Sequence, residues 1–280
     1  MTVVVVTDSS SRLSDELCEQ WGIRQVPLHV LDGENDLRDG VDVMPPDIHD
    51  RPKVTTSGAT PVEIAEVYRQ ALTDSGGDGV VAIHISAALS STYSSAASAA
   101  REFGHAVRVV NSRSAAMGIG FAALAAARAA HSGAALDDVE AAARSAAHRS
   151  HAFIVVHRLD NLRRSGRIGT AASWLGTALS LKPLLRLDMD GRLVLSQRIR
   201  TASKAHAALV EQVVEVVGDR QADVVVHHVD NIDAAKEIGT QLTERLPVLR
   251  SLEVSDMGPV LAVHVGGGAV GVAVSVEAEN

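Results

Sequence analysis

Residues 80–100 read VVAIHISAALSSTYSSAASAA, and this stretch contains each kind of element that the first half of the chain repeats. It begins with a short Val- and Ile-rich run, Val80 to Ile85, which is typical of a buried strand. A loop rich in serine and threonine follows, and a helical pattern comes directly after that loop. Short apolar runs alternate with helical patterns in this way from residue 3 to about residue 150, which predicts a mainly parallel, Rossmann-like α/β sheet.

The other elements of this half are predicted from the same signals. Strands are expected at Val3 to Thr7, Gln25 to Val30, Val80 to Ile85 and Val107 to Val110. The sequence Thr60-Pro61-Val62-Glu63 combines an N-cap threonine, a proline at the first helical position and a glutamate in capping-box register, so a helix should begin there. Two further helices, over about 115–130 and 138–149, close this half, the second with a capping box from Asp137 to Glu140.

The order of elements changes after residue 150. The predicted series is a strand from Phe153 to Leu159, a basic loop at 163–167, a short helix near Trp174, a hairpin around Asp190-Gly191 with arms at 181–187 and 193–200, a helix at 205–217, a strand at 224–229, a helix at 232–245 and three closing strands. This mixture predicts a second, mixed α/β domain. We therefore expect domains at 1–150 and 151–280, with the ligand in a cleft between them.

Composition excludes several classes of protein. The 280 residues carry a net charge of −8, which argues against a general nucleic-acid-binding protein. Aromatic residues make up only 2%, which leaves little aromatic surface for stacking on bases or sugars. Cys18 is the only cysteine, so we expect no intramolecular disulfide, no thiolate zinc cluster and a cytoplasmic protein. The apolar residues 3–6 are too few for a signal peptide, and the stretch 258–276 is better interpreted as two adjoining buried strands than as a membrane span.

Two loops concentrate hydroxyl side chains immediately before helices. They are Val54-Thr55-Thr56-Ser57-Gly58 and Ser86-Ala87-Ala88-Leu89-Ser90-Ser91-Thr92-Tyr93. Hydroxyl groups beside the free N–H groups of a helix start form an uncharged binding site for an anionic head group. The alternative is that these residues are ordinary helix caps, because serine and threonine are preferred at that position.

Other motifs are less specific. The run 266–271, GGGAVG, fits a dinucleotide-binding pattern, but too few residues follow it to complete the unit, and 118–123 fits a variant of the pattern inside a helical stretch. His227 and His228 are neighbours on a strand and should point to opposite faces, so we expect no metal site there. His264, also expected in a strand, is either a core histidine or a residue close to a ligand. No catalytic signature such as G-x-S-x-G is present.

Taken in order, these motifs resemble the DegV family of bacterial fatty-acid-binding proteins, which includes the acyl carrier subunit of fatty acid kinase. The resemblance runs from Val3 to the C-terminus. It rests on TDSS at 7–10, TS at 56–57, LSSTY at 89–93, VVNSRS at 109–114, residues 162–168, LKPL at 181–184, DG at 190–191, and GPV at 258–260 through HVG at 264–266.

The resemblance implies a two-domain α/β protein that buries one long-chain fatty acid between its domains. It places Thr56 and Ser90, with their neighbours Ser57 and Ser91, at the carboxylate, and His264 close to the same head group. It also implies that Arg167, Arg198 and Arg200 lie toward the carboxyl end, where a kinase subunit docks. The chain departs from the family pattern at Gly58-Ala59-Thr60, where the family has Gln-Pro-Ser, and at Ser91, where it has Gly.

We therefore expect a monomeric carrier with no catalysis of its own, no resident cofactor and no metal, which presents a fatty acid to a kinase partner for acyl phosphate formation. One alternative is a lipid hydrolase or acyltransferase that uses Ser90 with His264 as base and Asp8 as the orienting acid. A second alternative is a fatty-acid sensor without a kinase partner. Acyl length and unsaturation do not follow from the residues.

Overall fold

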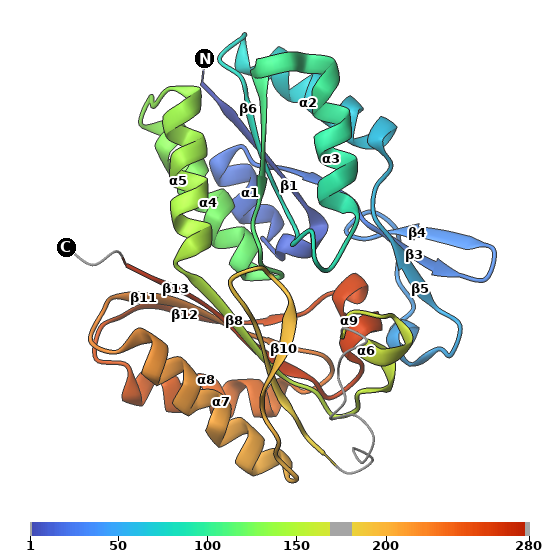
Figure 1. Cartoon of the computed structure of the whole chain (residues 1–280), viewed down its shortest axis with the longest axis vertical. Helices are drawn as coiled ribbons and strands as arrows, with labels where there is room; N and C mark the ends of the chain where they lie inside the picture. The colour runs from blue at the N-terminus through green and yellow to red at the C-terminus, as the bar shows by residue number, and fades with distance from the viewer. Residues whose placement is uncertain (1, 169–180, 278–280) are drawn as a thin grey trace.

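The computed structural model describes residues 2–168 and 181–277, and it contains two main sheets stacked one above the other (Figure 1). The first sheet is parallel, in the order β2 (Arg24–Val26), β1 (Val4–Asp8), β6 (Val80–His84) and β7 (Val107–Asn111). The second has six strands in the order β10 (Leu193–Gln197), β9 (Leu184–Leu187), β8 (Ser150–Val155), β13 (Val270–Val276), β11 (Ala222–His228) and β12 (Leu249–Asp256). Its only parallel pair among the described residues is β11 with β12. The predicted α/β architecture is confirmed.

Alternate residues of the first sheet face two different layers of helices, as the period of two in a strand requires. Val5 and Ile83 belong to the apolar cluster built with α4 (Met117–His131) and α5 (Leu136–His148). Val6 and Ala82 belong to the cluster on the other face, with α2 (Pro61–Ser75) and α3 (Thr92–Ala100). The short helix α1 (Asp15–Trp21) packs beside α4.

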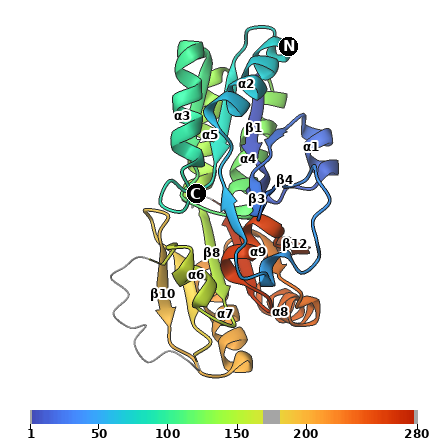
Figure 2. The same ribbon diagram turned by 90° about the vertical axis from the view of Figure 1, so that its right-hand side faces the viewer.

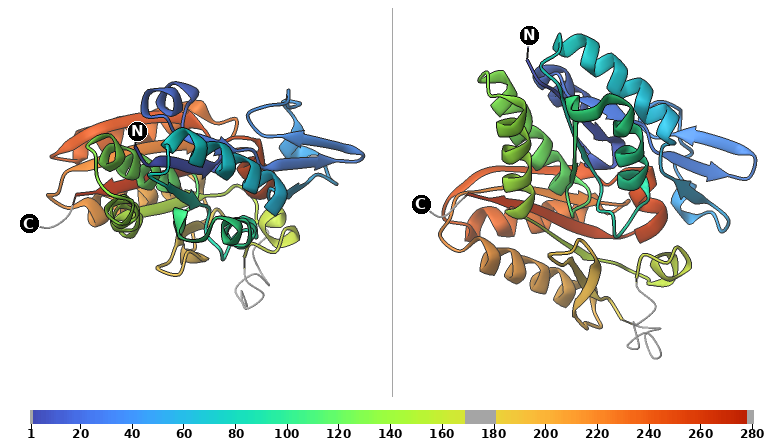
Figure 3. Two further views of the ribbon diagram at one scale, coloured as in Figure 1. Left: turned by 90° about the horizontal axis from the view of Figure 1, so that it is seen from above. Right: turned by 45° about the horizontal axis from the view of Figure 1, so that its top comes forward.

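The second sheet has one face covered by α7 (Ala202–Val217) and α8 (Ile232–Arg245), as the right panel of Figure 3 shows. Its other face meets the first half of the chain. Val225 and Ala273, from the second sheet, lie in the same apolar cluster as the core of the first sheet and α4. The two sheets are therefore joined by a continuous core at α4.

A third, small sheet projects from the side of the molecule (Figures 1 and 2). It consists of β4 (Asn35–Arg38), β3 (His29–Asp32) and β5 (Thr55–Ser57), all antiparallel, and we call it the arm. The prediction of a single strand over Gln25 to Val30 was wrong. Pro27 has no N–H for a sheet ladder, so β2 ends at Val26 and the chain turns into the arm. The loop predicted around Thr56 is in fact the edge strand β5.

Two other expectations are corrected. The closing region contains a helix, α9 (Pro259–Val265), in place of a strand; it begins with a proline at the first helical position, after Gly258 with φ 77°. His264 therefore lies on a helix. The predicted capping box in α5 is also absent: its N-cap is Ala135, which has no side-chain acceptor, and Asp137 pairs with Arg108 instead.

The strongest local signals were correct. Thr60 and Glu63 form the reciprocal capping box at the start of α2. Asp190 and Gly191 lie in the turn between β9 and β10, with Gly191 at φ 75°. The 118–123 motif lies inside α4, and the 266–271 motif lies between α9 and the start of β13. The helix predicted near Trp174 falls outside the described residues, and no described helix is long and apolar enough to cross a membrane.

Candidate functional site

A cavity of about 270 Å³ lies between the two halves of the chain, and residues of both halves line it. Its walls are mainly aliphatic. The first half contributes Leu28, Ile85, Leu89, Ala115 and Ala116, and the second contributes Ala152, Phe153, Ile154, Leu162, Leu187, Leu193, Met257, Val260, Leu261, Val265, Val272 and Ala273. Such a surface suits a hydrocarbon ligand, because the gain from removing apolar surface from water needs no specific partner.

The cavity lies where the fold places ligands in open α/β sheets. In the first sheet the order β2-β1-β6-β7 reverses direction between β1 and β6, which makes the carboxyl ends of these two strands a topological switch point. Ile85, the residue after β6, lines the cavity, and so does Leu89 a few residues later. The site therefore follows from strand order as well as from side-chain chemistry.

Polar groups gather in one corner of the cavity. Thr56 Oγ1 lies 2.7 Å from His264 Nε2, which joins β5 of the arm to α9. A Cβ added at Gly58 would lie only 2.7 Å from Thr92 Oγ1, so β5 also approaches the start of α3 closely. Thr92 Oγ1 in turn lies 2.8 Å from Ser90 Oγ. Thr56, Ser90 and His264 all line this cavity, and Thr56 contacts His264 although 208 positions separate them.

Ser57 and Ser91 also line the cavity, and both are exposed. The alternative of helix capping holds in part. Ser90 Oγ accepts a hydrogen bond from the N–H of Thr92, the first residue of α3, at 3.2 Å. Thr56 caps no helix, since the cap of α2 is Thr60. A Cβ at Gly58 would lie 2.7 Å from Thr92 Oγ1, so a larger residue at this position would require the Thr92 side chain to move.

Arg167 is a cation at the same corner. Its Nε donates to the carbonyl oxygen of Leu89 at 3.2 Å, and its Nη1 donates to the carbonyl oxygen of Ser165. No aspartate or glutamate is among the described residues that line the cavity. An anionic group placed here would therefore meet one guanidinium, several hydroxyl groups and no carboxylate.

Arg198 and Arg200 do not join this corner. Both are exposed and lie beyond the end of β10, and neither lines the cavity. Ile168, next to Arg167, bridges to Leu193 at the opposite end of β10. At 3.3 Å per residue, Arg198 is roughly 16 Å further along the strand. The sequence grouped these arginines, whereas the structure separates them.

His264 is held in its neutral form. Burial and then the charge of Arg167 lower the pKa of His264 to about 4. Its Nδ1 is buried and has no hydrogen-bond partner among the described residues. A neutral imidazole next to a hydroxyl can donate a hydrogen bond to an anion without an ion pair to break on release.

The parts of the catalytic triad considered as the alternative are not assembled. Asp8 Oδ2 lies 3.0 Å from Nδ1 of His84, not near His264, and Thr56 rather than Ser90 contacts His264. The described residues therefore provide no acid to orient His264 and no serine–histidine pair.

His227 has a structural role that could not be predicted from the amino-acid sequence. The N–H of Met117, the first residue of α4, donates to His227 Nε2 at 3.3 Å, so this buried imidazole caps a helix from across the interface of the two halves. Burial, with smaller effects of Arg12 and His228, lowers the pKa of His227 to about 3. No group of three or more histidine, cysteine, aspartate or glutamate side chains in the described ranges could hold a metal ion.

A sequence model of the DegV family, described as uncharacterised proteins, matches residues 2–277. The chain belongs to the DegV family. A DegV domain-containing protein of Mycobacterium tuberculosis is 61% identical to it over 278 residues, 99% of each chain.

Solved DegV structures have the same fold. A DegV family protein of Corynebacterium glutamicum is 36% identical, with a TM-score of 0.89 over 100% of both chains. A DegV family protein of Thermus thermophilus, described as binding fatty acid, is 31% identical, with a TM-score of 0.92 over 99% of this chain and 100% of the other. The family and the fold expected from the motifs are confirmed.

The low pKa of His264 leads to a pH-dependent stability. The folded chain keeps His264 neutral down to about pH 4, whereas the unfolded chain protonates it near pH 6.5. Because the unfolded state binds more protons in this window, the free energy of unfolding should fall as pH falls from about 6.5 to about 4, by about 3 kcal/mol for this residue. Denaturant unfolding at pH 7 and pH 4 should show a smaller loss for His264→Asn than for the wild type. The control His148→Asn, at an exposed position of α5, should show the full loss. An equal loss in His264→Asn would mean that His264 is not held neutral.

Proposed function

We propose that this protein binds one long-chain fatty acid in the cavity between its two halves and presents the carboxylate to an ATP-dependent kinase subunit. The observation that carries the proposal is the cavity itself, which is aliphatic along its walls and has hydrogen-bond donors without carboxylates at one corner. The fatty-acid binding described for the Thermus thermophilus relative supports the same ligand class.

In this proposal the first half, residues 1–150, binds the head group and the second half, 151–280, covers the acyl chain. The hydroxyl groups of Thr56 and Ser90 and the imidazole of His264 donate to the carboxylate, with Ser57 and Ser91 at the exposed side. Arg167 supplies the positive charge. The Thr56–His264 hydrogen bond of 2.7 Å marks where the carboxylate would insert.

The acyl chain and the head group contribute differently to the free energy of binding. Burying about fifteen methylene groups contributes roughly 12 kcal/mol before ordering costs, at about 0.8 kcal/mol each. A hydrogen bond to a charged acceptor contributes about 1.5 to 3 kcal/mol. The acyl chain therefore dominates affinity, while the head-group donors set its orientation and the preference for a carboxylate.

In the reaction that we propose, a carboxylate oxygen of the bound fatty acid attacks the γ-phosphorus of ATP, and ADP leaves from the kinase subunit. The carrier contributes position only, since its polar corner lacks a base that an acid orients. Arg198 and Arg200, exposed beyond β10, belong to the proposed docking surface. A sensor without a partner differs from this proposal only in the absence of that reaction.

The first prediction concerns bound lipid. The protein expressed in a bacterial host should purify with one fatty acid per chain, because an aliphatic cavity takes up hydrocarbon wherever lipid is present. Native mass spectrometry before and after organic extraction measures the bound mass. A protein that carries no acyl chain and binds neither palmitate nor oleate when these are added would contradict the proposed function.

The second prediction concerns the head-group donors. Thr56→Ala and Ser90→Ala should each lower palmitate affinity by roughly one to two orders of magnitude, because each removes a hydrogen bond to a charged acceptor while the methylene contribution remains. Titration calorimetry with palmitate measures the change. Ser94→Ala is the matched control, since Ser94 is an exposed hydroxyl on α3 that bonds only to the carbonyl of Ser91. Normal binding by both variants would place the carboxylate elsewhere.

The third prediction concerns docking. Arg200→Glu should leave palmitate affinity unchanged and lower the rate of acyl phosphate formation by a matching kinase, more strongly at low salt, because charge complementarity speeds association. Arg144→Glu is the control, as Arg144 is exposed on α5, outside both the hairpin and the cavity wall. The assay follows ADP release with lipid-loaded protein. Equal turnover for Arg200→Glu and the wild type would exclude this arginine from the docking surface, and no turnover with any kinase would favour the sensor.

A further inference from the structure

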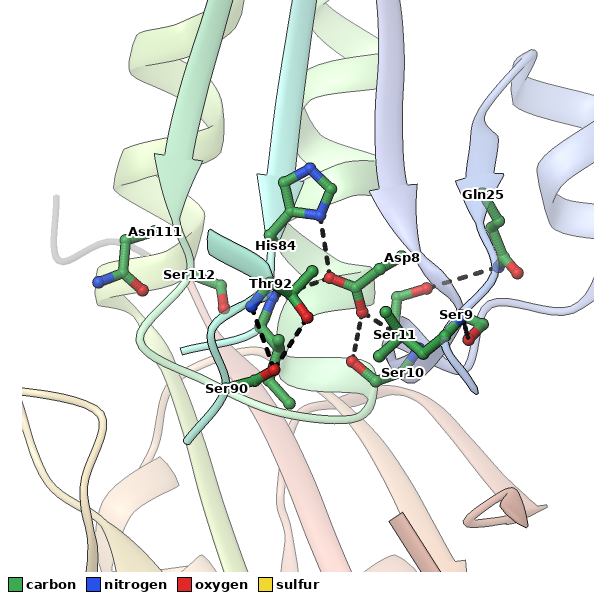
Figure 4. Close-up of polar contacts among 12 residues, drawn as sticks. Asp8, Ser9, Ser10, Ser11, Gln25, His84, Ser90, Thr92, Asn111 and Ser112 are labelled. Carbon is green, nitrogen blue, oxygen red and sulfur yellow. Dashed lines mark hydrogen bonds and ion pairs between the residues drawn. The ribbon is translucent and has the colours of Figure 1, made fainter. Parts of the chain in front are cut away.

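The TDSS motif at the end of β1 has no part in the proposed site, yet its aspartate is one of the most heavily bonded groups in the protein. Asp8 is completely buried, and so are His84 and Tyr68. Figure 4 shows the Asp8 carboxylate between the ends of β1 and β6, with hydrogen bonds on both sides. A buried carboxylate is costly unless donors surround it, so this arrangement needs an explanation.

One oxygen of the carboxylate fixes the start of the loop that carries Ser90. Asp8 Oδ2 accepts from the backbone N–H of Ile85 at 3.0 Å and lies 3.0 Å from His84 Nδ1. Ile85 lines the cavity and is the residue at which the chain leaves β6 for the loop. The bond to its N–H therefore sets where the loop to Ser90 begins.

The other oxygen fixes the turn that holds the base of the arm. Asp8 Oδ1 accepts from the N–H of Ser10 at 3.2 Å and from the Ser10 hydroxyl. In the same turn, Ser9 Oγ accepts from the N–H of Leu28 at 3.1 Å. Leu28 lines the cavity and directly precedes β3, whose residue Val30 pairs with Thr56.

Arg12, directly after the Ser9–Ser11 turn, contacts the other strand end at the base of the arm, with Nη1 3.7 Å from Asp39 Oδ1. Burial raises the pKa of Asp39, and Arg12 and the Ser9 hydroxyl oppose that rise. Asp39 donates its N–H to the carbonyl of Leu28 at 2.7 Å, so the two ends of the arm meet at this turn. The turn thus holds the arm from both of its ends.

A third link runs through His84 to the helix that follows the arm. His84 Nε2 lies 2.9 Å from the hydroxyl of Tyr68 in α2, the helix that begins shortly after Thr56. A ring that donates from Nδ1 to Asp8 and accepts at Nε2 from Tyr68 has both nitrogens paired. The ring orientation, and with it the direction of the Asp8 carboxylate, is fixed by this chain of bonds.

We propose that Asp8 is a positioning residue for head-group recognition, which sets the spacing between Thr56 and Ser90 by anchoring the arm and the β6–α3 loop to one carboxylate. The proposal rests on the function proposed above, because it assigns the carboxylate of a fatty acid to those two hydroxyl groups. Asp8 does not line the cavity and is completely buried. It acts only through the two loops.

The test separates recognition of the head group from general stability. Affinities of the full-length protein for palmitate and for hexadecanol, which has the same chain length and no carboxylate, are measured for the wild type and for Asp8→Asn. The amide turns one acceptor oxygen into a donor and so must release one anchor. Asp8→Asn should lose roughly tenfold in palmitate affinity and less than about twofold in hexadecanol affinity. Equal losses for both ligands would overturn the proposal.

Double variants identify which loop each bond holds. In the Asp8→Asn background, Thr56→Ala and Ser90→Ala should each cost much less than in the wild type. Ser9→Ala should reduce the loss of palmitate affinity caused by Thr56→Ala but not the loss caused by Ser90→Ala, because it releases only the arm. Ser11→Ala is the matched control, since this buried hydroxyl of the same turn accepts from Leu13 and Gln25 and touches neither loop. If Thr56→Ala lowers palmitate affinity equally in the Ser9→Ala background and in the wild type, the proposal is overturned. This comparison decides the question if Asp8→Asn does not fold.

The two proposals fail in different ways. If the wild type does not prefer palmitate to hexadecanol, the proposed function is wrong and the role of Asp8 falls with it. If the wild type has that preference and Asp8→Asn keeps it, the proposed function stands and the positioning role is wrong.

Discussion

The close packing of α4 between the two sheets is the constraint on which the rest of the structure depends. A helix that is apolar on nearly every side must be buried on nearly every side, and α4 contacts β1 and β6 above and β8 and β13 below. Two glycines of α4 allow neighbouring segments to approach the helix closely: a Cβ at Gly118 would lie 1.9 Å from Ser114 Oγ, and one at Gly120 would lie 3.1 Å from the carbonyl oxygen of Ser11. The capped N-terminus of α4 holds the second sheet at His227. The cavity lies beside this contact, with Ala115 and Ala116 in its wall.

Electrostatics at the polar corner follow from what is buried there. Burial, with the nearby charge of Arg167 as a second cause, keeps the His264 imidazole neutral, so the corner has one cation, neutral donors and, among the described lining residues, no acid. A carboxylate does lie at the switch point between β1 and β6: it belongs to Asp8, the last residue of β1. Its donors come from the protein itself, which leaves it bonded to the scaffold rather than open to a ligand. The described lining residues of the corner therefore include no carboxylate, while the Asp8 carboxylate supports the fold behind it.

The same residues explain why no catalytic triad is assembled among the described residues, although the chain contains serine, histidine and aspartate. Catalysis by a nucleophilic serine requires these groups in one line of hydrogen bonds. Here Asp8 pairs with His84, His264 pairs with Thr56, and Ser90 pairs with Thr92. The first two pairs join distant elements of the fold, and the third lies at the start of α3, so the three residue types support the structure at separate places.

The sequence by itself determined what depends on neighbours along the chain. The capping box of α2, the turn at Asp190-Gly191 and the extent of α8 from Ile232 to Arg245 follow from local backbone chemistry, and the ordered motifs identified the family. Local signals failed where distant residues compete. The valine-rich run after Gly258 favours a strand, yet α9 forms there and presents His264 to Thr56 across 208 positions. The arm, the separation of Arg167 from Arg198 and Arg200, and the Asp8–His84–Tyr68 chain were likewise decided only by the tertiary structure. The physical reason is that burial and hydrogen bonding across the interface of the two halves depend on which segments meet in space, and that information is absent from any short window of sequence.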